Sequence, residues 1–215
     1  PSRKPTQGMD LFSSLRLLQS FRQVTVVDGK LFFQTPSDRE ILIGHSIDGV
    51  ITMAPLDSFA NIRAGWGLFE AKKRNVECDA RVDLSRGKLD SLSLKLEPSP
   101  IENFASVLSS LFETKQGTVR GEWAFRENSG FRGFLEIQNA GLGIKNTGLE
   151  FQKIHTMAVW EGSKILFSGG VDEFHGSRLT LGGRIEGWPS PQWDLQLGGD
   201  ALDLGAILKA INKNF

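Results

Sequence analysis

Apolar and polar residues alternate with a period of two along most of this chain. The clearest stretches are residues 76–84, 92–96 and 193–197, with looser ones at 62–68, 131–137, 165–167 and 179–181. Because successive side chains of a strand point to opposite faces, this pattern predicts antiparallel strands with one apolar and one solvated face. The 24 Gly residues suit the turns and bulges of such a sheet. The chain is therefore predicted to be mainly β.

Three short stretches with helical spacing interrupt the alternation. Asp10, Ser99 and Asp203 are their expected N-caps, and the second stretch adds Pro100 at the first helical position and Glu102 three residues after the cap. The expected apolar stripes are Leu11, Leu15 and Leu18, then Ile101, Phe104, Leu108 and Leu111, then Leu204, Ile207, Leu208 and Ile211. Helices this short are not stable alone, so each is expected to lie on the sheet.

One stretch of the alternating pattern recurs. Val27, Gly29, Leu31 and Phe33 match Val119, Gly121, Trp123 and Phe125 at a spacing of 92 residues. This spacing predicts two repeats, each a meander of about five to six strands closed by a helix. We expect a frayed start at 1–9, a first repeat at 10–113 and a second at 114–215, in one continuous domain excised from a longer protein. Asp28-Gly29 and its counterpart Arg120-Gly121 are interpreted as glycine bulges within long strands.

Composition narrows the function classes. Lys plus Arg equals Asp plus Glu at 25 each, which argues against nucleic acid as a partner, because that partner requires a basic surface. The 15 Phe and 5 Trp without any Tyr favour surfaces that stay dry. No run of 18 apolar residues occurs, so no segment of this sequence is expected to span a bilayer. Cys78 lies on an alternating apolar side and is interpreted as a small hydrophobe.

No set of residues in the sequence supports catalysis, so no enzyme activity, metal site or cofactor is expected. Asp172, Glu173 and His175 match metal ligands in type but not in spacing, and are interpreted as a polar loop. His45 and His155 have no acid or nucleophile nearby in the sequence. The basic run at 71–75 is interpreted as a solvated turn, with contact to anionic lipid headgroups as the alternative.

Two stretches carry a family resemblance. LTLGGRIEGWPSPQWDLQLGGDALDLGAIL, residues 179–208, and VTVVDGKLFF, residues 24–33, resemble the AsmA-like superfamily of bacterial envelope proteins, which includes TamB-like and YhdP-like members. The matching positions are Gly183, Gly187, Pro191, Leu195, Leu197, Leu202, Asp203 and Leu204. The resemblance implies a half-open β-groove with an apolar concave face for lipid acyl chains. It also implies a periplasmic segment of a protein anchored in the inner membrane, active in phospholipid transport and outer-membrane biogenesis.

The alternating residues themselves allow two architectures. Either two sheets pack as a sandwich, or one curved antiparallel sheet leaves a dry groove. The repeat favours the groove, because stacked repeats extend one continuous surface. Its expected lining is Val24, Val26, Leu31, Phe33, Trp66, Leu68, Val76, Val82, Leu92, Leu94, Trp123, Phe125, Leu135, Ile137, Leu179, Leu181, Trp193, Leu195 and Leu197.

Three functions remain open. The first is a segment that holds or conducts phospholipid between the inner and outer membranes. The second is a non-enzymatic assembly scaffold of the same family that binds outer-membrane protein strands at a sheet edge. The third is a carbohydrate-binding β-sandwich that presents Trp platforms, of which Trp188 is the one expected to be most exposed.

Overall fold

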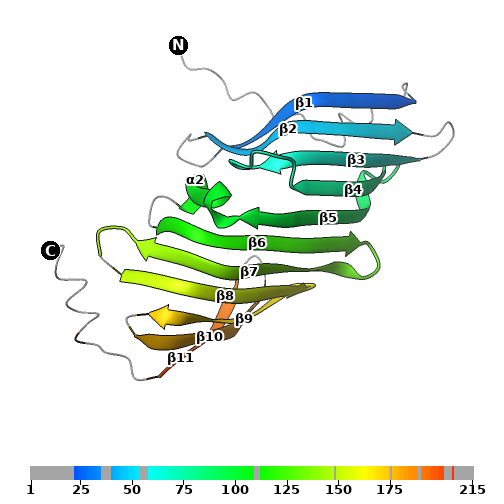
Figure 1. Ribbon diagram of the computed structural model, residues 1–215. Helices are drawn as coiled ribbons and strands as arrows, with labels where there is room; N and C mark the ends of the chain where they lie inside the picture. The colour runs from blue at the N-terminus through cyan, green and yellow to red at the C-terminus, as the bar shows by residue number, and fades with distance from the viewer. Residues whose placement is uncertain are drawn as a thin grey trace, which may run out of the picture.

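One open antiparallel sheet makes up nearly all of the described structure. The computed structural model describes residues 22–34, 40–53, 58–108, 112–147, 149–174, 176–187, 190–200 and 205, excepting the side chains of 33 and 34. Its eleven strands pair in strict chain order from β1 to β11, as Figure 1 shows. Among the described strands, β1 and β11 are therefore at the two edges, and the sheet that these strands form is not closed. The prediction of a mainly β, antiparallel fold is confirmed.

The strands are eight to fifteen residues long. They are β1 (Gln23–Gln34), β2 (Glu40–Met53), β3 (Phe59–Leu68), β4 (Val76–Asp83), β5 (Lys88–Pro100), β6 (Phe112–Arg126), β7 (Gly130–Ile144), β8 (Leu149–Glu161), β9 (Lys164–Phe174), β10 (Ser177–Glu186) and β11 (Gln192–Gly199). A short helix lies between β5 and β6, and consists of η2 (Ile101–Phe104) followed by α2 (Ala105–Leu108). Each strand thus follows its neighbour through a hairpin connection, except at this helix.

The described strands form one sheet and not two packed sheets. The sandwich considered from the sequence therefore does not form within the described part of the chain. Residues that lie directly opposite each other in an antiparallel pair share a face, so the register divides all eleven strands into two faces. One face is largely apolar and the other is largely polar, as the alternation predicted.

The strand starts of β6 to β10 follow those of β1 to β5 at a nearly fixed distance of 88 to 90 residues. For example, β1 starts at Gln23 and β6 at Phe112, and β2 starts at Glu40 and β7 at Gly130. After the fifth strand the correspondence ends, because β5 leads into the helix whereas β10 leads into β11. This spacing is compatible with the predicted repeat units of 10–113 and 114–215 but does not by itself establish them.

The two proposed glycine bulges differ. β1 runs through Asp28-Gly29 with Asp28 at a φ of 52°, and its register with β2 shifts on both sides of Gly29, so a bulge is confirmed there. β6 also runs uninterrupted through Arg120-Gly121, and its register with β7 is regular there but shifts around Gln116. Its register with β5 shifts between Gly121 and Val119, but the extra residue lies on β5 between Leu96 and Ser99. The expected bulge at Gly121 is therefore wrong, although the long strand is right.

Only one helix is present among the described residues, so the prediction of three is confirmed for the second alone. The stretches starting at Asp10 and Asp203, and the expected frayed segment 1–9, lie outside the described residues apart from Gly205. The predicted cap at Ser99 is wrong. β5 extends to Pro100, which takes the N-cap position without a side-chain hydrogen bond, and Ser99 is buried and bonded elsewhere.

Candidate functional site

The candidate site is the apolar face of the sheet, which we define as the side that carries Trp66, Val76 and Leu96. The register places Trp66 opposite Val76 and Val76 opposite Leu96 across β3, β4 and β5. Further cross-strand neighbours on this face are Leu92 with Phe125, Leu94 with Trp123, Val119 with Ile137, Leu135 with Ala158, Val171 with Leu179, Leu181 with Leu197, and Ile185 with Trp193. The face therefore continues from β3 to β11 without a break.

The first two strands extend the same face. Val24 lies opposite Ile51 and Val26 opposite Gly49, while Ile51 lies opposite Ile62 of β3. Leu31 lies opposite Gly44, which in turn lies opposite Leu68. The side chain of Phe33 is outside the described part of the chain. The other predicted lining residues are thus brought to one face by the register.

Burial along this face falls toward the edges of the sheet. Val76 and Val82 are buried. Val24, Trp66, Leu68, Leu92, Leu94, Trp123, Phe125, Leu135, Ile137 and Leu179 are half-buried, whereas Val26, Leu31, Leu181, Trp193, Leu195 and Leu197 are exposed. On β11 the exposed fractions reach 63% for Trp193, 57% for Leu195 and 71% for Leu197. Large apolar side chains are therefore open to solvent where the sheet ends.

The helix covers one end of the apolar face. Ile101 is buried in a cluster with Val76, Leu96, Val119 and Ala140. Phe104 joins this cluster and also meets Phe69 edge to face, with ring centroids 5.3 Å apart. In Figure 1 the helix lies at the end of the strands and not across their middle. It therefore acts as a cover for one end and leaves the centre of the face half-buried.

A second buried cluster lies at the opposite ends of the same strands. It contains Met53, Ala60, Val82 and Leu84, and Ile62 packs against it from β3. The residues between the two clusters, such as Leu92 and Phe125, are only half-buried. On the first half of the sheet, the apolar face is therefore buried near both ends of the strands and more exposed between them.

Large aromatic rings lie close against glycines on this face. A Cβ added at Gly44 would come within 2.9 Å of the Trp66 ring, and one at Gly133 would come within 2.4 Å of the Trp123 ring. Strand glycines opposite aromatic residues leave the space that such a ring fills. These glycines were not among the predicted site residues. The sequence signal was available, because Gly within a strand marks a close approach.

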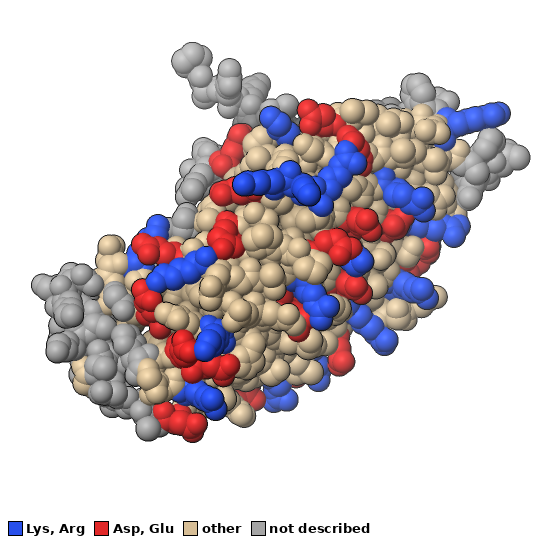
Figure 2. Space-filling model, viewed as in Figure 1, with Lys and Arg blue, Asp and Glu red and all other residues tan. Residues whose placement is uncertain are grey.

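The opposite, polar face is held together by ion pairs between directly opposing residues. Arg63 of β3 pairs with Asp79 of β4 at 2.9 Å, and both residues occupy one register position. The same relation holds for Arg120 with Glu136, Lys164 with Glu186, and Arg184 with Asp194. Figure 2 shows basic and acidic side chains interspersed over the surface in view, with neither sign forming a continuous patch. These pairs favour one register of the strands and neutralise part of the charge of this face.

A hollow of about 750 Å³ lies on the polar face across β2 to β6. Short side chains at Ser91, Ser93 and Ala124 line it together with Arg63 and Arg126. Arg63 is committed to Asp79, which lines the same hollow. This arrangement offers polar contacts but no pair of groups suited to proton transfer.

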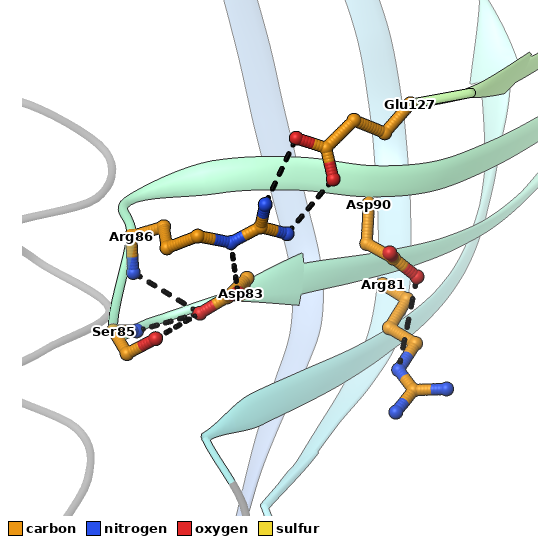
Figure 3. Close-up of polar contacts among 6 residues, drawn as sticks. All are labelled: Arg81, Asp83, Ser85, Arg86, Asp90 and Glu127. Carbon is orange, nitrogen blue, oxygen red and sulfur yellow. Dashed lines mark hydrogen bonds and ion pairs between the residues drawn. The ribbon is translucent and has the colours of Figure 1, made fainter.

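One polar network ties together two turns at the same end of the sheet (Figure 3). Arg86, in the β4–β5 turn, donates from Nε to Asp83 at 2.6 Å and through both terminal nitrogens to Glu127 at 3.0 and 2.8 Å. Asp83 also accepts from the Ser85 hydroxyl at 2.6 Å and from two backbone N–H groups of the turn. The hydrogen bonds from Ser85 and Arg86 hold the pKa of Asp83 well below its ordinary value of 3.8.

A second polar network lies beside the helix. The buried Asn75 side chain accepts from the Leu68 N–H at 2.8 Å and donates to the Ser99 hydroxyl at 2.8 Å, which donates to the Glu97 carbonyl at 2.7 Å. These bonds join the ends of β3, β4 and β5 at the point where the helix begins. Ser99 therefore has a structural role that replaces the capping role expected from the sequence.

The remaining candidates from the sequence lie apart from one another. In the run 71–75, Ala71 and Asn75 are buried, and Arg74 pairs with Asp48 of β2. Cys78 is half-buried on the apolar face, and burial, with the neighbouring Asp79 carboxylate, raises the pKa of its thiol. A raised pKa keeps the thiol protonated and unreactive, as expected of a small hydrophobe.

The two histidines and the acidic loop complete this set. The rings of His45 and His155 lie over Gly67 and Gly170 of adjacent strands. His175 and Trp188 lie outside the described residues. Within the described ranges, no three His, Cys, Asp or Glu side chains gather as a metal ion would require. The helix from 101 to 108 is also too short to cross a membrane, and the described chain contains no longer one.

The chain matches no protein-family model, no curated protein and no solved structure. The class of protein that the coordinates define is therefore an open, eleven-stranded amphipathic β-meander with one end of its apolar face covered by a helix. The resemblance to AsmA-like proteins depends on the residues of 24–33 and 179–208 alone.

Proposed function

We propose that this chain is a segment of an AsmA-like envelope protein that holds or conducts phospholipid along its apolar face. The observation that carries the proposal is the unbroken apolar face across eleven strands, which other described residues only partly cover. Soluble monomeric proteins rarely expose contiguous apolar patches of this kind unless the patch binds a partner. Acyl chains match such a surface because they need no hydrogen bonds from it and gain from leaving water.

In this proposal the sheet forms a curved groove built from two meander repeats. The near-constant distance between the strand starts of β1–β5 and β6–β10 supports the repeat. The close packing of the Trp66 and Trp123 rings against Gly44 and Gly133 supports an aromatic lining along which an acyl chain could lie. The two buried clusters would then lie at opposite ends of the strands. The half-buried residues between them would form the path of the lipid.

The proposal requires no chemistry from the protein. The charged side chains of the polar face are largely engaged in ion pairs that connect adjacent strands, and the apolar face presents few groups that could transfer a proton. We therefore propose a non-enzymatic segment without metal or cofactor, located in the periplasm as part of a protein anchored in the inner membrane. Phospholipid is its proposed partner, together with other envelope proteins.

The test is lipid capture from vesicles of phosphatidylethanolamine and phosphatidylglycerol, followed by native mass spectrometry of the purified protein. We expect co-purifying phospholipid and crosslinking to a photoreactive acyl chain. Leu195→Asp should abolish crosslinking near β11 with little change in stability, because Leu195 is exposed. Leu94→Asp should also block lipid, but with a loss of several kcal/mol, because Leu94 packs against the buried cluster.

Matched controls lie one residue away on the polar face. Gln196→Asp and Ser93→Asp add the same charge to the same strands but point away from the lipid path, since neighbouring residues of a strand face opposite sides. Both should leave crosslinking unchanged. Equal crosslinking of all four variants, or no lipid on the parent protein, would rule out the apolar face as the binding surface.

A second candidate is the assembly scaffold that binds protein strands. The outer edge of β11, which no described strand pairs with, favours it, because an open edge accepts another strand through its backbone. The carbohydrate-binding β-sandwich has less support. The described strands form a single sheet, and of the four tryptophans that the structure describes, Trp66, Trp123 and Trp160 are half-buried and Trp193 is exposed.

A further inference from the structure

The two edges of the sheet differ in how they are protected against another strand. β1 carries a bulge at Asp28-Gly29, three interruptions of its register with β2, and the charged residues Asp28 and Lys30 in mid-strand. The Asp28 N–H is already used by the Asp48 carboxylate at 2.9 Å. Bulges and mid-strand charges are the features by which edge strands avoid pairing. β1 is therefore a poor template for a further strand.

β11 is less protected, since it has no bulge and its one mid-strand charge is paired within the sheet. Its eight residues pair with β10 in eight successive positions without a shift, and the strand contains no Pro, Lys or Arg. Asp194, its single charged residue, lies opposite Arg184 of β10 and pairs with it at 3.4 Å. Trp193, Leu195 and Leu197 alternate on the apolar face and are the most exposed residues of the predicted lining. A regular edge whose single charge is paired within the sheet and whose alternate residues are apolar is a surface that pairs readily.

The strand order determines which pairing would continue the sheet. Ten antiparallel steps separate β1 from β11, so the two edge strands run in the same direction. Stacking copies head to tail would therefore place β11 parallel to the bulged β1. A two-fold axis perpendicular to the sheet instead sets β11 antiparallel to β11 of another copy and keeps both apolar faces on one side.

We infer that the outer edge of β11 pairs with β11 of a second copy of this chain, giving a continuous sheet in a two-fold symmetric dimer. The inference does not depend on lipid binding. It depends on the regular register of β11, its self-complementary sequence and the protection of β1 at the other edge. An interface of this kind is isologous, so each strand meets the same strand of its partner.

The sequence of β11 fits this symmetry when the axis passes Leu195. Leu195 then lies opposite the partner's Leu195, and Trp193 lies opposite the partner's Leu197. On the polar face Asp194 lies opposite the partner's Gln196, so that no two like charges meet. Apolar side chains thus continue across the junction, and the amide of Gln196 can donate to the carboxylate of Asp194 across the junction.

A single eight-residue edge buries less surface than the 1,200 to 2,000 Å² that is roughly typical of stable interfaces. The dimer is therefore expected to be weak and to depend on protein concentration. Sedimentation velocity and light scattering over a wide concentration range should show the mass rising from monomer to dimer. Leu195→Lys should raise the dissociation constant at least tenfold, because it places two lysines opposite each other at the axis.

The controls separate edge pairing from loss of an apolar side chain. Leu181→Lys makes the same change one strand inward on the same face, and Val27→Lys makes it on the exposed opposite edge. Both should dimerise like the parent. If Val27→Lys abolishes the dimer and Leu195→Lys does not, or if the parent remains monomeric at all concentrations, the inference is overturned.

Cysteine crosslinking gives an independent measurement. In a Cys78→Ala background, Leu195→Cys places two thiols opposite each other at the axis, where oxidation should give a covalent dimer. Val27→Cys should give none under the same conditions. A Leu195→Cys protein that stays monomeric on oxidation, while its thiol is shown to be accessible to alkylation, contradicts the proposed axis.

Discussion

The Arg86 guanidinium donates to both carboxylate oxygens of Glu127, at 3.0 and 2.8 Å, and joins two turns that are 41 residues apart in the sequence. The two parallel hydrogen bonds fix the orientation of the guanidinium as well as its distance. The pair therefore ties the β4–β5 turn to the β6–β7 turn at one end of the sheet.

Replacement of Arg86 tests this connection. Arg86→Lys keeps the charge but cannot form two parallel bonds to Glu127 while also bonding Asp83. We expect the melting temperature to fall by a few degrees and amide exchange to rise in both turns. The measurement is a thermal melt with hydrogen-exchange mass spectrometry.

The control for Arg86→Lys is Glu161→Gln, which changes an exposed charge that makes no ion pair with any other described residue. It should melt like the parent. Unchanged exchange in the β6–β7 turn of Arg86→Lys would show that the two turns are not coupled.

The same network predicts acid sensitivity. The pKa of Asp83 in the folded chain lies well below its ordinary value of 3.8, so between these two values the unfolded chain binds the extra proton. The stabilisation is therefore fully present above pH 3.8 and is lost as the pH falls below it. Urea unfolding from pH 7 to pH 2 should show this decline. Asp83→Asn should be less stable than the parent at pH 7, and the difference should shrink toward pH 2.

The close approach of the Trp66 ring predicts a specific cost at Gly44. Gly44→Ala would bring a methyl group within 2.9 Å of the ring, which must then tilt out of the apolar face. Overpacking of this kind destabilises a fold by about 1 to 3 kcal/mol. Denaturant unfolding followed by tryptophan fluorescence measures both the loss and the ring movement. Gly65→Ala is the control, since its nearest atom outside its own neighbours is at an ordinary 3.4 Å. Equal stability of the two variants would contradict the close packing.

The buried Asn75–Ser99 bond predicts the last stability effect. Ser99→Ala leaves the Asn75 amide without its acceptor in a buried site, which is expected to cost about 1 to 3 kcal/mol. Ser93→Ala removes a hydroxyl from the exposed polar face of the same strand and should be nearly neutral. Chemical denaturation compares the two. A neutral Ser99→Ala would mean that the network does not stabilise the base of the helix.

The strands could be predicted because the alternation of apolar and polar residues is visible within each strand alone. The alternation of residues 76–84 and 193–197 depends on local spacing. As expected, the first stretch covers β4 and the second lies within β11. The same alternation also assigned most lining residues to one face, since the period of two fixes the face within each strand. It could not decide between one sheet and two, because that depends on which strands pair.

Local sequence was misleading where a distant residue determines the structure. Ser99, Pro100 and Glu102 match a capping motif, yet Asn75, 24 residues earlier, takes the Ser99 hydroxyl and lets β5 continue to Pro100. The Arg86–Glu127 pair was missed for the same reason. The local partner of Arg86 is Asp83, three residues earlier, and nothing in the sequence near either residue points to Glu127. Only the hairpins bring the two turns together. Gly44 and Gly133 indicated a close approach, because they lie within strands, but the sequence did not show which ring approaches each of them.

The strict chain order of the strands has a consequence for how this protein gains structure. Every backbone ladder joins two strands that are adjacent in the sequence. Each strand can therefore pair without contact to a distant part of the chain. Low contact order of this kind favours rapid folding despite an all-β architecture. Once one hairpin has formed, the neighbouring strands can add to it one after another. Removing the outermost hairpin should then shorten the sheet while the remaining strands keep their partners.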